Sequence, residues 1–190
     1  VIMTMMQNAF ANTSSSILGS KMQGNIVDLL MPPLNANEII FSYISAAIIR
    51  AILVGFLTYI FIYPFTEIYL YKIVILFIYS ILGSILLALL GLIAGIWAEK
   101  FDNMSGVTNF IITPLTFLSG TFYSIDRLPE PFYSISLFNP FYYIIDGFRS
   151  AFEKDVSYHL VYGITYISVL NLIIYLLSYN ILKKGWMLKP

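Results

Sequence analysis

Long apolar stretches alternate with short charged segments along the whole of this 190-residue chain. A helix needs about 20 apolar residues to cross the ~30 Å hydrocarbon core of a bilayer, where the backbone finds hydrogen-bond partners only within the protein. Five stretches meet that length: residues 1–20, 39–64, 73–98, 103–125 and 156–182. The pattern therefore predicts an all-α, polytopic membrane protein that forms a single transmembrane domain over residues 1–190.

Two of the stretches contain a residue that an ordinary lipid-facing helix lacks. Pro114 removes a backbone donor within 103–125 and predicts a kink there. Arg50 is the one charge well inside a stretch, and an intramembrane charge is by default a candidate functional residue. Alternatively, the span begins near Ala47, and Arg50 then extends to the cytoplasmic interface. The sequence leaves both interpretations of Arg50 open.

Two stretches have faces that suit contact between helices. Small residues recur at helical spacing within 73–98, and small side chains let helix backbones approach closely in a membrane. They are Ser84, Ala88, Gly91 and Gly95. Packing within one subunit is the simpler interpretation, and a seam between two subunits is the alternative. The last stretch places polar residues on one face, for which we expect interhelical hydrogen bonds rather than a polar substrate track. They are Ser168, Asn171, Tyr175 and Ser178.

The composition agrees with a membrane protein. Apolar residues make up 59% of the chain and charged residues 11%, and the mean hydropathy is +0.83. A soluble domain carries roughly 25% charged residues, so this chain has too few to cover a water-facing surface. Ten basic side chains balance ten acidic ones, and no basic patch indicates binding to nucleic acid.

No motif in the sequence indicates catalysis or metal binding. There is no cysteine, and a single histidine, His159, excludes a multi-histidine metal site within the chain. Gly19-Ser20-Lys21 lacks the first glycine of a phosphate-binding loop, and no Gly-x-Ser-x-Gly nucleophile motif occurs. We therefore predict neither a catalytic centre nor a cofactor here, so that energy for active transport would have to come from a partner.

The charges between the stretches predict the orientation. Cytoplasmic connections of membrane proteins are enriched in lysine and arginine. With the C-terminus inside, the inner connections hold Lys21, Lys100, Lys183, Lys184 and Lys189, and the outer ones hold Lys72, Arg127, Arg149 and Lys154. Lys183-Lys184 directly follow the last stretch, and tyrosines and phenylalanines crowd residues 59–71 at the proposed outer interface. We predict a cytoplasmic C-terminus.

Residues 21–38 form a connection that is more than a loop. Asn25 is placed to cap a short helix that would carry Ile26, Leu29 and Leu30 on one face, and Pro32-Pro33 would end it. Such an amphipathic element either lies on the membrane surface or docks into a groove of a partner.

Residues 126–155 form the longest connection, and an uncharged, aromatic-rich stretch lies within it. That stretch, 131–145, is too short and too rich in proline to span. It suits an interfacial or re-entrant pair of helices with the turn at Asn139-Pro140. Asp146 and Arg149 follow, three residues apart, and we expect a local ion pair between them.

Two segments resemble the ABC-2 type family of ABC transporter permeases, which includes bacterial exporters of polysaccharides, lipids and drugs. The first is Lys21-Met-Gln-Gly-Asn-Ile-Val-Asp-Leu-Leu-Met-Pro-Pro-Leu-Asn-Ala-Asn-Glu38, with its basic residue, glycine, Leu-Leu pair, proline and acidic residue. The second comprises Leu118-Ser-Gly-Thr-Phe-Tyr-Ser-Ile125, Leu128-Pro and Asn139-Pro-Phe-Tyr-Tyr-Ile-Ile-Asp-Gly-Phe-Arg149. The order of the apolar stretches agrees as well, so the resemblance covers essentially the whole chain.

The resemblance implies a permease subunit with six spans in the bacterial inner membrane, not an enzyme. Residues 1–20 would then be the end of the second span, and an amphipathic helix and a first span would precede Val1. A second permease subunit, as a homodimer, and separate ATPase subunits that bind ATP-Mg are the implied partners. The implied coupling helix contains Gly24, Asn25, Ile26, Asp28, Leu29, Leu30, Pro32 and Pro33. The implied outer hairpin is marked by Asn139, Pro140, Tyr143, Asp146 and Arg149.

Two other classes of protein compete with this interpretation. A membrane-embedded lipid-modifying enzyme would need polar or acidic residues clustered within one leaflet, and they are scattered here. An ion-coupled carrier or channel would need paired intramembrane charges, whereas Arg50 stands alone. The 17% of aromatic residues suits a saccharide pathway and an interfacial belt equally, so it does not identify the substrate.

Overall fold

The computed structural model describes residues 1–25, 34–65, 69–120, 129–130, 132–154 and 160–184. Their regular secondary structure is entirely helical. The elements are α1 (Ile2–Met22), α3 (Ala36–Ile62), η1 (Tyr63–Phe65), α4 (Ile73–Trp97), α5 (Phe101–Val107), η2 (Thr108–Ile112), α6 (Thr113–Phe117), α7 (Phe132–Phe138), α8 (Pro140–Ser150) and α9 (Leu160–Lys184). The all-α prediction is confirmed for this part of the chain.

Three helical segments among the described residues are long and apolar enough to cross a membrane: Ala36–Phe65, Ile73–Trp97 and Leu160–Lys184. They correspond to the predicted stretches 39–64, 73–98 and 156–182. The 21-residue helix α1 is not among them, because amide and hydroxyl side chains lower its hydropathy. The helical run through α5, η2 and α6 ends at Phe117, before the end of the predicted stretch 103–125. The count of five spans therefore stays a prediction.

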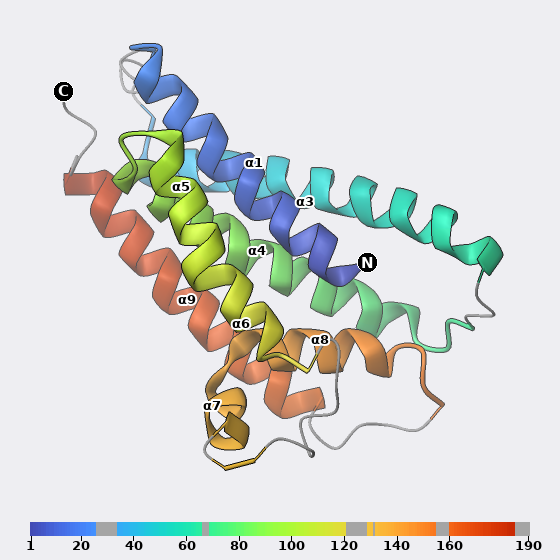
Figure 1. Cartoon of the computed structure of the whole chain (residues 1–190). Coiled ribbons are helices and arrows are strands. Elements are labelled where there is room, and N and C mark those ends of the chain that lie inside the picture. The colour runs from blue at the N-terminus through green and yellow to red at the C-terminus, as the bar shows by residue number, and fades with distance from the viewer. Residues whose placement is uncertain (26–33, 66–68, 121–128, 131, 155–159, 185–190) are drawn as a thin grey trace.

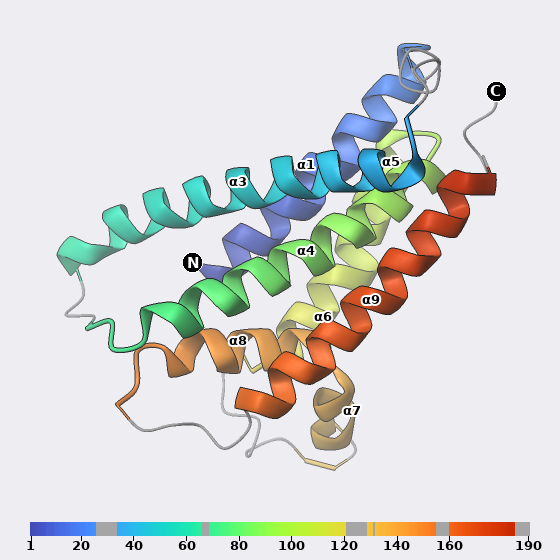
Figure 2. The same cartoon turned by 180° about the vertical axis from the view of Figure 1, so that it is seen from behind.

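The long helices run between two common ends of the molecule (Figures 1 and 2). The end of α1, the start of α3, the α4–α5 turn and the end of α9 lie together, and we call this the C-terminal end. The opposite end, which we call the hairpin end, holds η1, α7, α8 and the start of α9. Helix α4 is central and contacts α1, α3, α8 and α9, which explains why it is the most buried of the three candidate spans.

Helices α1 and α4 pack with their backbones in close approach. A Cβ atom at Gly91 would lie 2.6 Å from the carbonyl oxygen of Phe10, and one at Gly95 would lie 2.8 Å from that of Ser14. Ser84 and Ala88, on the same stripe of α4, are fully buried. Only residues without a bulky side chain permit this approach, so the small-residue stripe serves contacts inside one subunit.

Local capping determines where α1 ends and where α3 begins. Gly24, with φ of +74°, adopts the left-handed conformation just after α1, as is common at helix C-termini. Asn35 starts α3, and its backbone N–H donates to Oε2 of Glu38 at 2.8 Å, which is half of a capping box.

The helix that contains Pro114 departs from α geometry just before the proline. Residues Thr108–Ile112 form a π-helical turn, and the Thr113 hydroxyl donates to the carbonyl oxygen of Thr108 at 2.9 Å. Proline has no N–H to donate, and a π-turn redistributes the hydrogen bonds around such a position. The structure thus shows a wider turn just before Pro114, and the kink predicted there stays a prediction.

Candidate functional sites

One side of α1 presents polar and small residues, whereas the candidate spans α3 and α9 present large apolar ones. We call it the α1 polar face, which consists of Thr4, Gln7, Asn8, Asn12, Ser15 and Ser16. These side chains are exposed or half-buried, whereas the opposite side of α1 packs its apolar residues against α4. In contrast, α3 and α9 expose phenylalanine, leucine, isoleucine and valine side chains. Lipid tails cannot satisfy amides, so this face suits water or another polar surface.

Arg50 contacts the α1 polar face. Its Nη1 donates to Oδ1 of Asn12 at 2.8 Å. Asn12 lies in the middle of the 21-residue helix α1, and Arg50 in the middle of the 27-residue helix α3. Helix α3 begins 14 residues before Arg50, or about 21 Å at 1.5 Å per residue. A sideways contact between two helix centres favours the intramembrane interpretation of Arg50 over an anchor at the interface.

Lys21 joins the end of α1 to the end of α4. Its Nζ donates to the carbonyl oxygens of Ile96 at 2.6 Å and Ala98 at 2.8 Å. The last carbonyls of a helix lack partners within the helix, and Lys21 supplies them from another helix. Burial lowers the pKa of Lys21, and the nearby Glu99 partly counteracts this.

The predicted coupling element begins immediately after this contact. Gly24 ends α1, as described above, and Asn25 is exposed, with its Nδ2 donating to Oε1 of Gln23 at 3.3 Å. The other predicted coupling residues lie outside the described residues. They are Ile26, Asp28, Leu29, Leu30, Pro32 and Pro33.

Asn139 holds two helices together at the hairpin end. Its Oδ1 accepts from the backbone N–H of Phe141 at 3.0 Å and so caps α8, while Pro140 occupies the first turn, where its missing N–H does no harm. Its Nδ2 donates to the carbonyl oxygen of Leu115 in α6 at 2.6 Å. Helices α7 and α8 meet at the predicted turn, Asn139-Pro140. Whether they re-enter the membrane is a separate question that stays a prediction.

Arg149 makes a second contact to the segment after α6. Its Nη2 donates to the carbonyl oxygen of Gly120 at 3.2 Å, and Gly120 has a positive φ of 73°. Asp146, the predicted partner of Arg149, is half-buried on α8, and their ion pair stays a prediction. Asn139 and Arg149, at the two ends of the motif, thus both donate to backbone carbonyls within residues 115–120.

Tyrosines attach α7 to the rest of the hairpin end. Tyr143 and Tyr166 donate their hydroxyls to the carbonyl oxygens of Leu137 and Phe138, the last residues of α7, at 2.9 and 2.8 Å. The Tyr143 ring lies 5.1 Å from the Tyr166 ring and 5.5 Å from that of Tyr162, centroid to centroid. The predicted motif residue Tyr143 therefore has a packing role that links α7, α8 and α9.

Tyr79 is a residue that the sequence analysis missed. It is fully buried in α4, and its hydroxyl donates to the carbonyl oxygen of Leu160 in α9 at 2.8 Å. A Cβ at Gly147 of α8 would overlap its ring, and one at Gly163 of α9 would lie 2.8 Å from its oxygen. Isolated glycines within two helices were the available signal, since they mark close approach.

The polar residues of the last stretch make interhelical hydrogen bonds. Nδ2 of Asn171 donates to the carbonyl oxygen of Leu82 in α4 at 3.1 Å, and the Tyr175 hydroxyl donates to Oδ1 of Asn37 in α3 at 2.9 Å. Our expectation of helix–helix contacts is confirmed for these two residues. Ser178 bonds within its own helix, and Ser168 is exposed.

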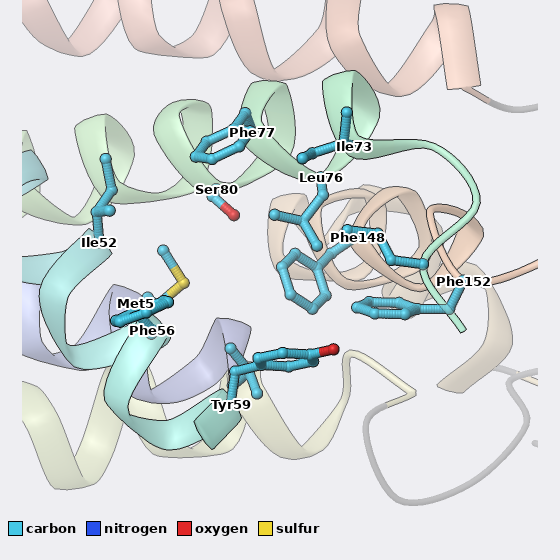
Figure 3. A pocket seen from close by; sticks show the side chains of 13 residues that line it. Met5, Ile52, Phe56, Tyr59, Ile73, Leu76, Phe77, Ser80, Phe148 and Phe152 are labelled. Atoms are coloured by element: carbon cyan, nitrogen blue, oxygen red, sulfur yellow. The ribbon is translucent and has the colours of Figure 1, made fainter. Parts of the chain in front are cut away.

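An apolar pocket of about 310 Å³ opens between α1, α3, α4 and α8 toward the hairpin end (Figure 3). Its walls include Met5, Phe56, Leu76 and Phe148. The Ser80 hydroxyl points toward the middle of the pocket (Figure 3) and has no hydrogen-bond partner among the described residues. No sequence signal predicted this pocket, because its walls come from four separate segments.

These features define an all-helical integral membrane protein whose polar contacts hold helices together. The chain belongs to the ABC-2 type transporter family, whose model matches residues 1–152. It is 33% identical over 187 residues to the inner membrane transport permease YadH of Escherichia coli K12, covering 97% of this chain and 72% of YadH. The YadH of Shigella flexneri matches equally well. No solved structure matches.

The membership confirms the predicted family. Both relatives are named inner membrane transport permeases, and this name supports a transport subunit rather than a catalytic enzyme. It also supports an integral protein of the inner membrane.

Proposed function

We propose that this chain is the transmembrane subunit of an ABC exporter. Together with a second copy of the permease it forms a pathway for a polysaccharide, a lipid or a drug-like molecule. A separate ATPase subunit, which binds ATP-Mg, supplies the energy. The observation that carries the proposal is the α1 polar face, because a membrane-embedded helix with exposed amides needs a pathway or a polar partner beside it.

The C-terminal end of the molecule suits the transmission of mechanical work. The proposed coupling residues follow α1 directly, and Lys21 bonds the end of α1 to the end of α4. Helix α4 in turn packs against α3, α8 and α9. A displacement of the coupling element would therefore move the central helix as well as α1, which a rigid-body change of access requires.

The hairpin end suits closure of the pathway on the far side. Helices α7 and α8 are held to α6 and α9 by Asn139, Tyr143, Arg149 and Tyr166. We propose that they form the outer hairpin over residues 126–155 and cap the exit, with the five visible spans as predicted and the C-terminus in the cytoplasm.

Substitution of Leu30 by aspartate tests the coupling proposal, because it would place a charge in an apolar groove of the ATPase. We expect the full-length variant, expressed in its native host, to lose the co-purifying ATPase and its substrate-stimulated hydrolysis. Leu34→Asp is the matched control, because Leu34 follows the two prolines and is 47% exposed. Wild-type yield and activity of Leu30→Asp would refute the coupling role, and no ATPase with the wild-type protein would favour an ion-coupled carrier.

A further inference from the structure

Within the part of the chain that the structure describes, Arg50 is a cation without a counter-ion at the centre of a long apolar helix. Its described hydrogen bond goes to Asn12, a neutral amide. Helix α1 contains no acidic residue, and Glu38, the acidic residue of α3, is 12 residues away, or about 18 Å along the helix. The other acidic residues that the structure describes are Glu99, Asp102, Glu130, Asp146 and Glu153, which lie outside the long helices. An unneutralised charge at this depth is costly.

Arg50 and Asn12 are accessible and have hydrogen-bond donors left for an anionic ligand. Arg50 is exposed and Asn12 is half-buried. A guanidinium has five N–H donors in a planar fork that matches phosphate and carboxylate oxygens, and the bond to Asn12 uses one of them. Since Asn12 accepts with its oxygen, its NH₂ group is a further donor beside the fork.

The surroundings of the pair combine a polar and an apolar surface. Asn8 and Ser15 lie on the α1 polar face, about one turn to either side of Asn12. On α3, Ile49 and Leu53 are 62% and 57% exposed beside Arg50. A ligand with an acidic group and an apolar portion can therefore contact Arg50 and the α3 surface at once.

We propose that Arg50 and Asn12 form a binding site for the anionic group of an amphiphile that moves along the α1 polar face. Phosphate and carboxylate groups share the chemistry that this site recognises. The inference deepens the proposed function, since it rests on the α1 polar face lining the pathway, and it names an acidic rather than a neutral or cationic cargo.

Direct binding to the permease tests the site without any ATPase. The full-length protein would be placed in nanodiscs of phosphatidylcholine and titrated with hexyl phosphate, hexanoate and hexyl glucoside. We expect Arg50→Gln to weaken binding of the two anions at least tenfold and to leave the glucoside unchanged. Arg50→Lys, which keeps the charge but loses the fork, should give an intermediate loss for hexyl phosphate.

Asn12→Asp distinguishes a specific loss of anion binding from a loss caused by unfolding. It gives Arg50 a carboxylate at the position of its present partner, so anion binding should fall as in Arg50→Gln while thermal stability is kept. Lys154→Gln is the control, because it removes an exposed cation outside the α1 polar face. Wild-type anion affinity in Arg50→Gln, or an equal loss for the glucoside, would overturn the site.

Two further results locate the source of the anion and separate the two proposals. Competition by phosphatidylglycerol added to the nanodiscs would assign the site to a bilayer lipid, and binding that persists would assign it to another solute. Both results support an anion site. Arg50-dependent binding in a protein with no co-purifying ATPase would retain the site and reject the exporter, whereas an active exporter without such binding would reject the site alone.

Discussion

Tyr79 shows how one side chain can fix the arrangement of three helices. Its ring fills a notch that Gly147 of α8 and Gly163 of α9 leave open, and its hydroxyl donates to the Leu160 carbonyl at the start of α9. A hydroxyl buried among apolar side chains needs a hydrogen-bond partner within the protein, and this carbonyl supplies it. The contact therefore combines packing with satisfaction of a buried donor.

Gly147→Ala tests this notch. The added methyl group would overlap the Tyr79 ring, so we expect a loss of about 1–3 kcal/mol in stability, as for other overpacked cores. Thermal unfolding in nanodiscs measures it. Gly106→Ala is the control, because no described atom outside its own helix turn lies within 4 Å of the place its methyl group would take. In a Tyr79→Ala background, Gly147→Ala should cost much less, and an unchanged cost would show that the ring is not the obstacle.

Asn139 is the second residue whose role reaches across the sequence. Asn139→Ala leaves the Leu115 carbonyl and the start of α8 without their partners, so we expect a loss of about 1–3 kcal/mol. Asn139→Asp should keep the cap, because a carboxylate oxygen can still accept from the Phe141 N–H. Its other oxygen would face the Leu115 carbonyl, however, and two acceptors cannot bond each other. Hydrogen exchange of the backbone after α6 should then rise in both variants. Asn180→Ala, near the end of α9 and away from this contact, should change neither stability nor exchange.

At the scale of single residues, the sequence identifies the residues that make important contacts, but it does not identify their hydrogen-bond partners. The Asn139-Pro140 turn follows from local rules, because asparagine caps helices and proline suits their first turn. The partner of Asn139 is a main-chain carbonyl 24 residues away, and no side-chain pattern marks a carbonyl. For the same reason, the sequence does not predict the bond from Arg149 to Gly120.

At the scale of elements, helix positions follow from length and hydropathy. The predicted stretch 73–98 corresponds to Ile73–Trp97, and 156–182 to Leu160–Lys184. Helix α3 begins at Ala36 rather than Ile39, because Asn35 and Glu38 cap it upstream of the apolar run. The π-turn at Thr108–Ile112 was not predicted, since Pro114 shows that a helix is perturbed but not how its hydrogen bonds rearrange.

Because Lys21 connects the end of α1 to the end of α4, we expect its removal to impair coupling. Lys21→Met leaves two carbonyls at the end of α4 without their partner, so we expect a loss of about 1–3 kcal/mol in stability. We also expect less substrate transported per ATP hydrolysed, because motion of the coupling element would no longer reach α4. Exposed Lys100→Met, at the same end of the molecule, should have neither effect.

The pH dependence of stability provides an independent check on Lys21. Its pKa in the folded protein lies below the usual 10.5, with burial as the main cause. The unfolded chain therefore binds more protons between the two pKa values, and the contribution of Lys21 to stability rises with pH there. We expect the difference in melting temperature between wild type and Lys21→Met to grow as the pH approaches 10.5. A shrinking difference would indicate an ion pair instead.

At the scale of the whole molecule, the alternating direction of the helices gathers the basic residues as the predicted topology requires. Lys21, Lys100 and Lys184 lie toward the C-terminal end, and Lys72 and Arg149 toward the hairpin end (Figures 1 and 2). The excess of basic residues at the C-terminal end is small, so it predicts only weakly which end faces the cytoplasm. The orientation is therefore the whole-molecule property that most needs a measurement.

The absence of cysteine from residues 1–190 simplifies this measurement, because single cysteines can be introduced there without removing others from this part of the protein. We expect cysteine at Phe65, Glu130 or Lys154 to react with a membrane-impermeant maleimide in intact spheroplasts. Cysteine at Asn25, Lys100 or Lys184 should react only after permeabilisation. Four pairs of neighbouring positions each test one crossing: Asn25 and Phe65 bracket α3, Phe65 and Lys100 bracket α4, Lys100 and Glu130 bracket the helix with the π-turn, and Lys154 and Lys184 bracket α9. Labelling at Lys100 and Glu130 from the same side would show that this helix does not cross and would reduce the predicted number of five spans. Reversed labelling at all six positions would keep the number of spans. It would, however, place the proposed coupling element outside the cell membrane, where no ATPase can reach it.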